Sequence, residues 1–271
     1  MKTLPLLGDE AIAQAAIDSG ITAIYAYPGT PSTEITEYVM RSKQARSSNV
    51  IAHWTANEKT AVEAALGVSY SGKRTMACMK HVGLNVAADP FMNSAITGAN
   101  GGIIIVSADD PSMHSSQNEQ DSRYFGNFAL IPILEPHDQQ EAYDMVHYAY
   151  DFSEKYQIPI LMRITTRLAH SRAGVSIKEQ RGQNEVHIPE DSRQYVLLPA
   201  IARKRYQALL EKQIAFEYES ENSKFNYLIE GKDKTLGIIA AGISFNYLME
   251  NYEKNNLQYP VLKIGQYPLP K

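Results

Sequence analysis

The chain has 271 residues and a mass of 30.2 kDa, enough for one large domain or for a domain with a smaller companion. Its 44% hydrophobic and 21% charged residues are typical of a globular protein, and a net charge of −4 gives no reason to expect nucleic acid or an anionic membrane as a partner. No apolar run approaches the roughly 20 residues that span a bilayer, and the N-terminus turns acidic too early for a signal peptide, so the chain is expected in the cytoplasm.

Helical and strand patterns alternate from the N-terminus to about residue 172. Strands are predicted at 21–27, 50–54, 74–79, 102–107, 131–134 and 159–164, and helices at 9–19, 32–42, from Glu58 onward, 84–97 and 138–155. The strand 102–107 is apolar throughout, which is typical of a parallel sheet covered on both faces. This alternation predicts an α/β fold with a parallel sheet.

The pattern changes after residue 171. A polar, irregular linker is predicted at 171–196, followed by a charged surface helix at 199–221. Beyond it, a strand at 235–242, a helix at 244–254 and a strand at 260–264 form one βαβ unit, which cannot cover both faces of its own sheet. We therefore predict a first domain over 1–172, a linker with a surface helix over 173–233, and an incomplete second α/β domain over 234–271.

Glu58 is a single carboxylate at the start of a helix rich in small residues. Its side chain has two interpretations. Thr55-x-x-Glu58 matches a capping box, in which the two side chains satisfy the amides at the helix end. Alternatively, Glu58 is a poorly solvated acid that binds a cofactor, since burial strengthens its hydrogen bond and raises its affinity for a proton. Another backbone could approach closely along the small-residue face formed by Ala61, Ala64, Ala65 and Gly67.

Two further segments follow the ends of predicted strands. Tyr27-Pro-Gly-Thr-Pro-Ser-Thr33 joins a strand to the N-terminus of a helix, where free amides and hydroxyls can hold a carboxylate, although it can also be a tight turn only. The segment 109–120 is polar and follows the apolar strand. It is either a solvated surface loop or, given its length and position, a functional one.

These segments resemble the pyrimidine-binding domain of thiamine-diphosphate-dependent 2-oxoacid:ferredoxin oxidoreductases. The similarity is greatest to alpha subunits of the indolepyruvate branch, nearly letter for letter in His114-Ser-Ser-Gln-Asn-Glu-Gln-Asp-Ser-Arg123. It covers essentially the whole chain, but only the first part of a longer subunit. The resemblance implies a pyrimidine-binding fold over 1–172.

The resemblance also implies roles for individual residues. Glu58 would bind N1′ of the aminopyrimidine and so activate the cofactor. Thr30 and Arg123 would hold the oxoacid, with Arg123 gripping its carboxylate, unless Arg123 is instead a structural ion-pair partner of Asp121 or Asp109. The other cofactor-binding positions implied are Pro28, Gly29 and Asn85.

The activity implied by the resemblance is oxidative decarboxylation of aryl pyruvates such as indolepyruvate, with coenzyme A taking the acyl group and ferredoxin taking the electrons. Two alternatives stay open. The chain can belong to a sister enzyme for pyruvate or 2-oxoglutarate, or it can be a non-catalytic assembly subunit. At His81, where the family commonly has Gln, and at Asp9, where it commonly has Asn, this sequence departs from the pattern, so we assign neither residue a role.

Several parts of such an enzyme are absent from this sequence. It has no Gly-Asp-Gly motif for the Mg²⁺ that anchors the diphosphate, so no metal ligand is assigned here. Cys78 is the only cysteine, which excludes an intrachain disulfide and an iron–sulfur cluster held by this chain alone. The resemblance therefore places Mg²⁺, the [4Fe–4S] clusters, the diphosphate-binding domain and a beta subunit elsewhere, and implies that the chain is inactive alone.

Overall fold

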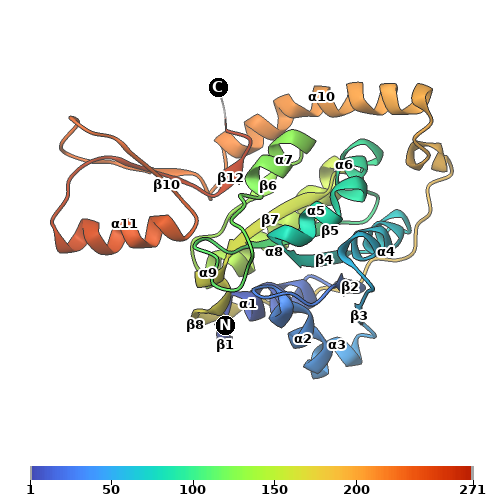
Figure 1. Ribbon diagram of the computed structural model, residues 1–271, viewed down its shortest axis with the longest axis horizontal. Helices are drawn as coiled ribbons and strands as arrows, with labels where there is room; N and C mark the ends of the chain where they lie inside the picture. Colours follow the sequence, from blue (N-terminus) through green and yellow to red (C-terminus); the bar gives the residue numbers. More distant parts are fainter. Residues whose placement is uncertain (1, 270–271) are drawn as a thin grey trace.

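A seven-stranded central sheet organises the structure, a computed structural model that describes residues 2–269 (Figure 1). Its strands are β2 (Ala23–Ala26), β3 (Ile51–Trp54), β4 (Thr75–Lys80), β5 (Ile103–Asp109), β6 (Ile133–Leu134), β7 (Ile160–Thr165) and β12 (Gln266–Tyr267). Their order across the sheet is β12-β6-β7-β5-β4-β2-β3. Only β12 runs antiparallel to its neighbour, so the predicted α/β fold with a mostly parallel sheet is confirmed.

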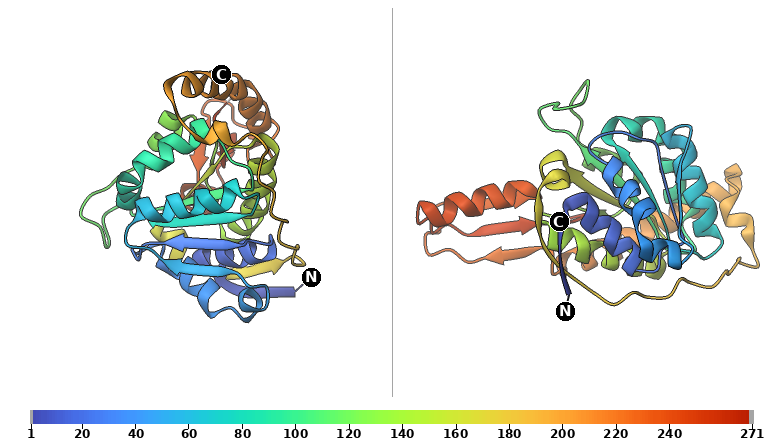
Figure 2. Two further views of the ribbon diagram at one scale, coloured as in Figure 1. Left: turned by 90° about the vertical axis from the view of Figure 1, so that its right-hand side faces the viewer. Right: turned by 90° about the horizontal axis from the view of Figure 1, so that it is seen from below.

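Helices cover both faces of this sheet (Figures 1 and 2). The helices of the structure are α1 (Gly8–Asp18), α2 (Thr33–Arg41), α3 (Lys43–Ser47), α4 (Glu58–Tyr70), α5 (His81–Val86), α6 (Ala88–Thr97), α7 (Arg123–Ala129), α8 (Gln139–Tyr156), α9 (Thr166–His170), α10 (Pro199–Glu221) and α11 (Ile243–Lys254), with a 3₁₀ turn at Ser192–Tyr195. Of these, α11 lies apart from the central sheet. On one face α1 packs between α2 and α8, while α4 and α6 pack together on the other. The long helix α10 lies across α6.

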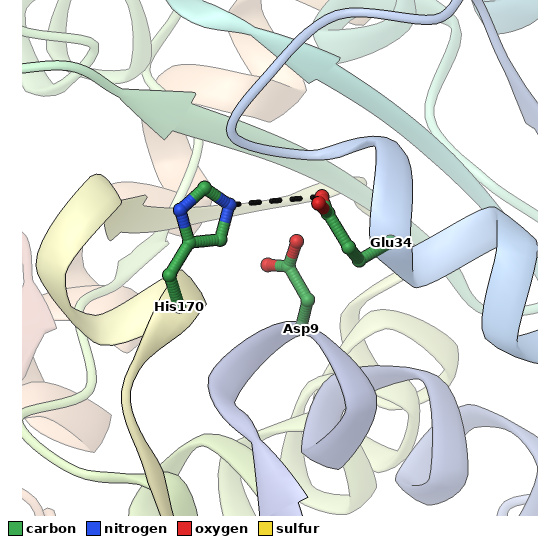
Figure 3. A group of neighbouring side chains, drawn as sticks. All are labelled: Asp9, Glu34 and His170. Atoms are coloured by element: carbon green, nitrogen blue, oxygen red, sulfur yellow. Dashed lines mark ion pairs between the residues drawn. The ribbon is translucent and has the colours of Figure 1, made fainter. Parts of the chain in front are cut away.

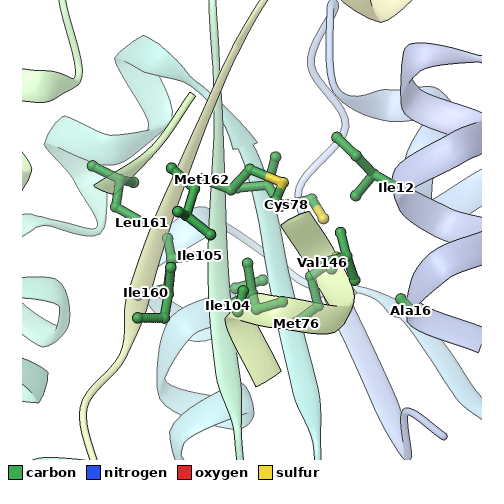
Figure 4. Packing of buried hydrophobic residues seen from close by; sticks show 14 of the residues in the cluster. Ile12, Ala16, Met76, Cys78, Ile104, Ile105, Val146, Ile160, Leu161 and Met162 are labelled. Atoms are coloured by element: carbon green, nitrogen blue, oxygen red, sulfur yellow. The ribbon is translucent and has the colours of Figure 1, made fainter. Parts of the chain in front are cut away.

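The core lies where the central strands meet the helices. Side chains of β4, β5 and β7 are buried on both faces of the sheet, which explains why these strands have no polar alternation (Figure 4). Ile12 of α1 and Val146 of α8 cover one face. Cys78 lies in this cluster, and burial raises the pKa of its thiol well above the usual value.

Two smaller sheets flank the body. β1 (Lys2–Leu7) pairs antiparallel with β8 (Arg172–Ile177), which joins the start of the chain to the end of the first predicted domain. β9 (Tyr227–Ile229), β10 (Ile238–Ala241) and β11 (Val261–Ile264) form a three-stranded sheet that projects from the body together with α11 (Figure 2). The chain then returns to the central sheet as β12. The division of the chain at residues 172 and 233 stays a prediction.

Some local details differ from the sequence-based expectation. The helix predicted over 84–97 begins at His81 and is divided at Ala87 into α5 and α6. The linker predicted over 171–196 contains β8 and is held against the body beyond it, because the amide of Arg181 donates to the carbonyl of Asp18 over 2.7 Å. Among the helices that the structure describes, none combines the length and the apolar character needed to cross a membrane.

Candidate functional site

The candidate residues gather at one edge of the central sheet, because parallel strands all end on the same side. The turn containing Thr30 follows β2, Glu58 follows β3, the start of α5 follows β4, and the loop 110–122 follows β5. In open α/β sheets, ligands bind in the crevice outside the carboxyl ends of the strands.

Capping of α4 does not use Glu58. The N-cap is Asn57, whose Oδ1 accepts from the Thr60 amide over 3.0 Å, while Thr60 Oγ1 accepts from the Asn57 amide over 3.4 Å. Thr55 instead donates its hydroxyl to the Asn57 carbonyl. The proposed Thr55–Glu58 capping box is therefore wrong. Asn57 has an extended backbone and immediately precedes the helix, so it is better placed to cap the helix end.

The carboxylate of Glu58 is nearly enclosed by the protein. The residue is 9% exposed and packs over the first turn of α5. At Gly83 an added Cβ would lie 2.5 Å from Glu58 Oε1 and 2.7 Å from its Cγ, so the side chain occupies this position only because residue 83 is glycine. Within residues 2–269 no group forms a hydrogen bond or an ion pair with the carboxylate, which leaves it available to an N–H group of a ligand.

The turn after β2 presents Thr30 and Pro28 to solvent, but its glycine is engaged internally. The Gly29 amide donates to Thr33 Oγ1 over 3.0 Å, and its carbonyl accepts from Ser32 Oγ over 2.9 Å. The side chain of Lys80 packs over Gly29, where an added Cβ would lie 3.1 Å from Lys80 Cδ. These contacts fix the shape of the turn and leave the Thr30 side chain at its exposed tip.

The loop 110–122 is anchored beside this turn. Lys80 Nζ donates to the Ser115 carbonyl over 3.1 Å, and Asp110 accepts hydrogen bonds from the Ser115 amide and from Thr166 Oγ1. Although burial of Asp110 acts in the opposite direction, these hydrogen bonds and one from Ser116 hold the pKa of its carboxyl well below the usual value. The segment is thus an ordered loop beside the Thr30 turn.

Two residues of α5 have contrasting surroundings. His81 is buried and its Nε2 lies 3.1 Å from the Asn118 carbonyl, so it contacts the same loop. Asn85, predicted to bind cofactor, is exposed on α5. No hydrogen bond within the described chain occupies its amide group.

Arg123 stands at the start of α7 and is held by carboxylates. Its Nε lies 2.9 Å from Asp121 Oδ1, its Nη2 lies 2.5 Å from Asp121 Oδ2, and its Nη1 lies 3.4 Å from Glu135 Oε2. Hydrogen bonding to Asp121 raises the pKa of the guanidinium. The ion pair with Asp121 that the sequence left open is present, while Asp109 pairs with Arg163 instead, over 2.7 Å. No hydrogen bond or ion pair within residues 2–269 joins Arg123 to Glu58 or Thr30.

A buried ion network therefore lies at the ends of β5, β6 and β7. Arg163 binds Asp109 and also Glu135, which links it to Arg123. Both arginines line a cavity of about 670 Å³ between this edge of the sheet and the β10–α11 unit, and Arg123 also lines a neighbouring cavity of about 540 Å³. The guanidinium groups of Arg123 and Arg163 therefore lie at a cavity, although carboxylates already contact each of them.

Replacement of Arg163 by Met is expected to lower the free energy of unfolding by about 3–5 kcal/mol, because it leaves Asp109 buried without its ion-pair partner and leaves Glu135 with Arg123 alone. Urea unfolding of this chain measures the change. Arg193→Met is the matched control, since Arg193 and Asp191 form an exposed pair whose loss should leave the free energy of unfolding almost unchanged. Equal losses in the two variants would contradict a special role for the buried network.

Comparison with known proteins identifies the family of the chain. The family model described as pyruvate flavodoxin/ferredoxin oxidoreductase, thiamine diphosphate-binding, matches residues 14–227, and the chain belongs to this family. Within the family it is similar to proteins named indolepyruvate oxidoreductase subunit IorA, with 46% identity to the protein from Archaeoglobus fulgidus and 43% to that from Pyrococcus abyssi, each over 98% of this chain. The chain spans 43% and 42% of the length of these two relatives.

A more distant relative and a solved structure are also similar to this chain. The 2-oxoglutarate synthase subunit KorA of Methanocaldococcus jannaschii is 26% identical over 66% of this chain and 50% of its own length. A solved structure of 2-oxoglutarate:ferredoxin oxidoreductase from Magnetococcus marinus shares the fold, with a TM-score of 0.76 and 18% identity over 99% of this chain and 55% of that one.

Proposed function

We propose that this chain supplies the aminopyrimidine side of a thiamine diphosphate site in a 2-oxoacid:ferredoxin oxidoreductase that acts on aryl pyruvates. The observation that carries the proposal is the Glu58 carboxylate, which is enclosed, unused by the helix cap and free of partners within the described chain. Thiamine diphosphate, when bound, supplies the nucleophilic carbon that adds to the ketone of an oxoacid and accepts the electrons left by CO₂.

The residues of this chain fit the aminopyrimidine. Glu58 would hold a proton between its carboxylate and ring nitrogen N1′, and low solvation strengthens that hydrogen bond. Gly83 leaves the space that this carboxylate needs. Pro28, Gly29 and Asn85 would contact the cofactor from the neighbouring segments.

Oxoacid binding is proposed for Thr30 and Arg123. The Thr30 hydroxyl stands on the exposed tip of its turn, and Arg123 offers a guanidinium beside two cavities. Because Asp121 already occupies one side of that guanidinium, the substrate carboxylate would share Arg123 with Asp121 or displace it.

The remaining parts of the enzyme are proposed to lie outside this chain. Relatives of more than twice its length have room for a diphosphate-binding domain with its Mg²⁺, since this chain covers 43% of such a relative. The [4Fe–4S] clusters, a beta subunit and the sites for ferredoxin and coenzyme A complete the assembly.

The substrate assignment rests on the names of the relatives. Identities of 41–46% to IorA proteins against 26–28% to KorA proteins favour indolepyruvate over 2-oxoglutarate. Values of kcat/KM for indolepyruvate, phenylpyruvate, pyruvate and 2-oxoglutarate with the complete enzyme test this choice. Highest values for the aryl pyruvates are expected. Highest values for pyruvate or 2-oxoglutarate would favour the sister enzymes, and no turnover with any oxoacid would favour a non-catalytic assembly subunit.

Arg123→Lys is expected to raise KM for the oxoacid clearly while lowering the melting temperature only slightly. Lys keeps the positive charge but cannot form the bidentate hydrogen bonds that a guanidinium makes to a carboxylate. Steady-state kinetics of the complete enzyme with an aryl pyruvate, beside a thermal melt, measures both effects. An unchanged KM with a lower melting temperature would show that Arg123 serves only as the ion-pair partner of Asp121 and Glu135.

This chain alone is expected to bind thiamine diphosphate with a Kd weaker than micromolar, since the metal–diphosphate anchor is proposed to lie elsewhere. Calorimetric titration in the presence of Mg²⁺ measures this affinity. A micromolar or tighter Kd would mean that residues of this chain hold the diphosphate as well.

A further inference from the structure

Three ligand-type side chains converge at a place that the proposed reaction does not use. Asp9 comes from the first turn of α1, Glu34 from the first turn of α2, and His170 from the end of α9 (Figure 3). One ligand atom from each lies within 4.8 Å of the others, and His170 Nε2 lies 3.7 Å from Glu34 Oε2. The picture shows the Asp9 carboxylate pointing toward the other two side chains.

Within residues 2–269, the Asp9 carboxylate is buried without a hydrogen-bond donor or a cation to offset the cost of its burial. Its exposed fraction is 0%, and neither of its oxygens has a hydrogen-bond partner among the described residues. Burial and the nearby Glu34 carboxylate raise the pKa of Asp9 well above the usual value. An unpaired buried carboxylate is costly unless it gains a proton or a cation, and this one faces a second carboxylate and an imidazole.

We propose that Asp9, Glu34 and His170 bind one divalent transition-metal ion, with Zn²⁺ as the best fit. One imidazole nitrogen with two carboxylate oxygens is a donor set that suits Zn²⁺, whereas Mg²⁺ and Ca²⁺ prefer oxygen ligands alone. Ligands at about 2.1 Å in a tetrahedral arrangement lie roughly 3.4 Å from one another, close to the 3.7 Å that separates Glu34 from His170. Water would complete the coordination.

A metal ion can reach the three side chains from a cavity beside His170. The side chain of His170 is 36% exposed and lines a cavity of about 300 Å³ together with His114 and Thr166. Glu34 directly follows the turn that carries Thr30, so a bound ion would fasten α2 and that turn to α1 and α9. This stabilising role is independent of the proposed decarboxylation.

Zn²⁺ titration of the metal-free chain by calorimetry tests the proposal, with Co²⁺ absorption as a second readout of the ligand set. We expect one saturable ion in the wild type and an affinity at least about tenfold weaker in Asp9→Asn and His170→Gln. Even outer-shell partners of a metal contribute about 10–100-fold, and a direct ligand should contribute no less. Glu37→Gln on the exposed side of α2 and His114→Gln in the same cavity are the controls, and both should bind like the wild type.

A thermal melt separates metal binding from folding. Asp9→Asn is nearly isosteric and removes an unpaired buried acid, so the metal-free variant should melt at or above the temperature of the metal-free wild type. Added Zn²⁺ should raise the melting temperature of the wild type but not that of Asp9→Asn. Equal Zn²⁺ affinity in the wild type, Asp9→Asn and His170→Gln would overturn the proposal, because the ion would then bind elsewhere on the chain.

Discussion

Glu58→Gln should lower turnover of the complete oxidoreductase by about 10²–10⁴-fold, the usual range for loss of a positioned acid or base, while the protein stays folded. Gln keeps the shape of the side chain but cannot hold the proton that the aminopyrimidine needs. Stability should change little, because Asn57 and Thr60 cap α4 and Glu58 takes no part. Turnover with an aryl pyruvate and a thermal melt of each variant provide the measurements.

Asn57→Ala is the matched control for this experiment. It removes the cap that the structure shows and should cost about 0.5–2 kcal/mol of stability, measured by urea unfolding, while turnover is retained. The two variants thus separate the two interpretations of the sequence around Glu58. Wild-type turnover in a folded Glu58→Gln enzyme would contradict the catalytic assignment.

Gly83→Ala should reduce turnover by about 100-fold, although it adds only a methyl group and removes no functional group from the site. Its Cβ would lie 2.5–2.9 Å from three atoms of the Glu58 side chain, so the carboxylate must move, and displacement of a catalytic group by about 1 Å can cost that much. Steady-state kinetics and a melt of the complete enzyme measure the effect.

Gly67→Ala gives the reference for a glycine-to-alanine change in the same region. Gly67 lies inside α4 with no atom near an added Cβ, so the substitution should stabilise this chain by about 0.5–1 kcal/mol in urea unfolding. If Gly83→Ala instead left turnover at the wild-type level, the position of Glu58 in the structure would not be the active one.

The main strands and helices could be predicted from the sequence because apolar runs and helical periodicity are properties of short segments. The apolar run that became β5 and the periodicity that became α8 predicted the parallel sheet and its covering helices. The pairings of β1 with β8 and of β12 with β6 join segments that are far apart in the chain, and no local pattern specifies such partners.

The candidate site, like the fold, could be predicted from the sequence only in part. The positions of Glu58 and Thr30 at strand ends were predictable, whereas the cap at Asn57 depends on where the helix begins, which sequence locates only to within a few residues. The space at Gly83 depends on the packing of α5 against α4. A charged residue inside the apolar run of β7 was the one signal of the ion network around Arg163, but its partners come from other strands.

Activation of thiamine diphosphate by Glu58 can be measured as proton exchange at C2 of the bound cofactor. The complete enzyme, loaded with thiamine diphosphate and Mg²⁺, is placed in D₂O, and loss of the C2 proton is followed by quenched-flow NMR in the wild type and in Glu58→Gln. Exchange should be at least about 100-fold slower in the variant, because Gln cannot hold the proton at N1′. Equal exchange rates in two folded, cofactor-saturated enzymes would contradict it.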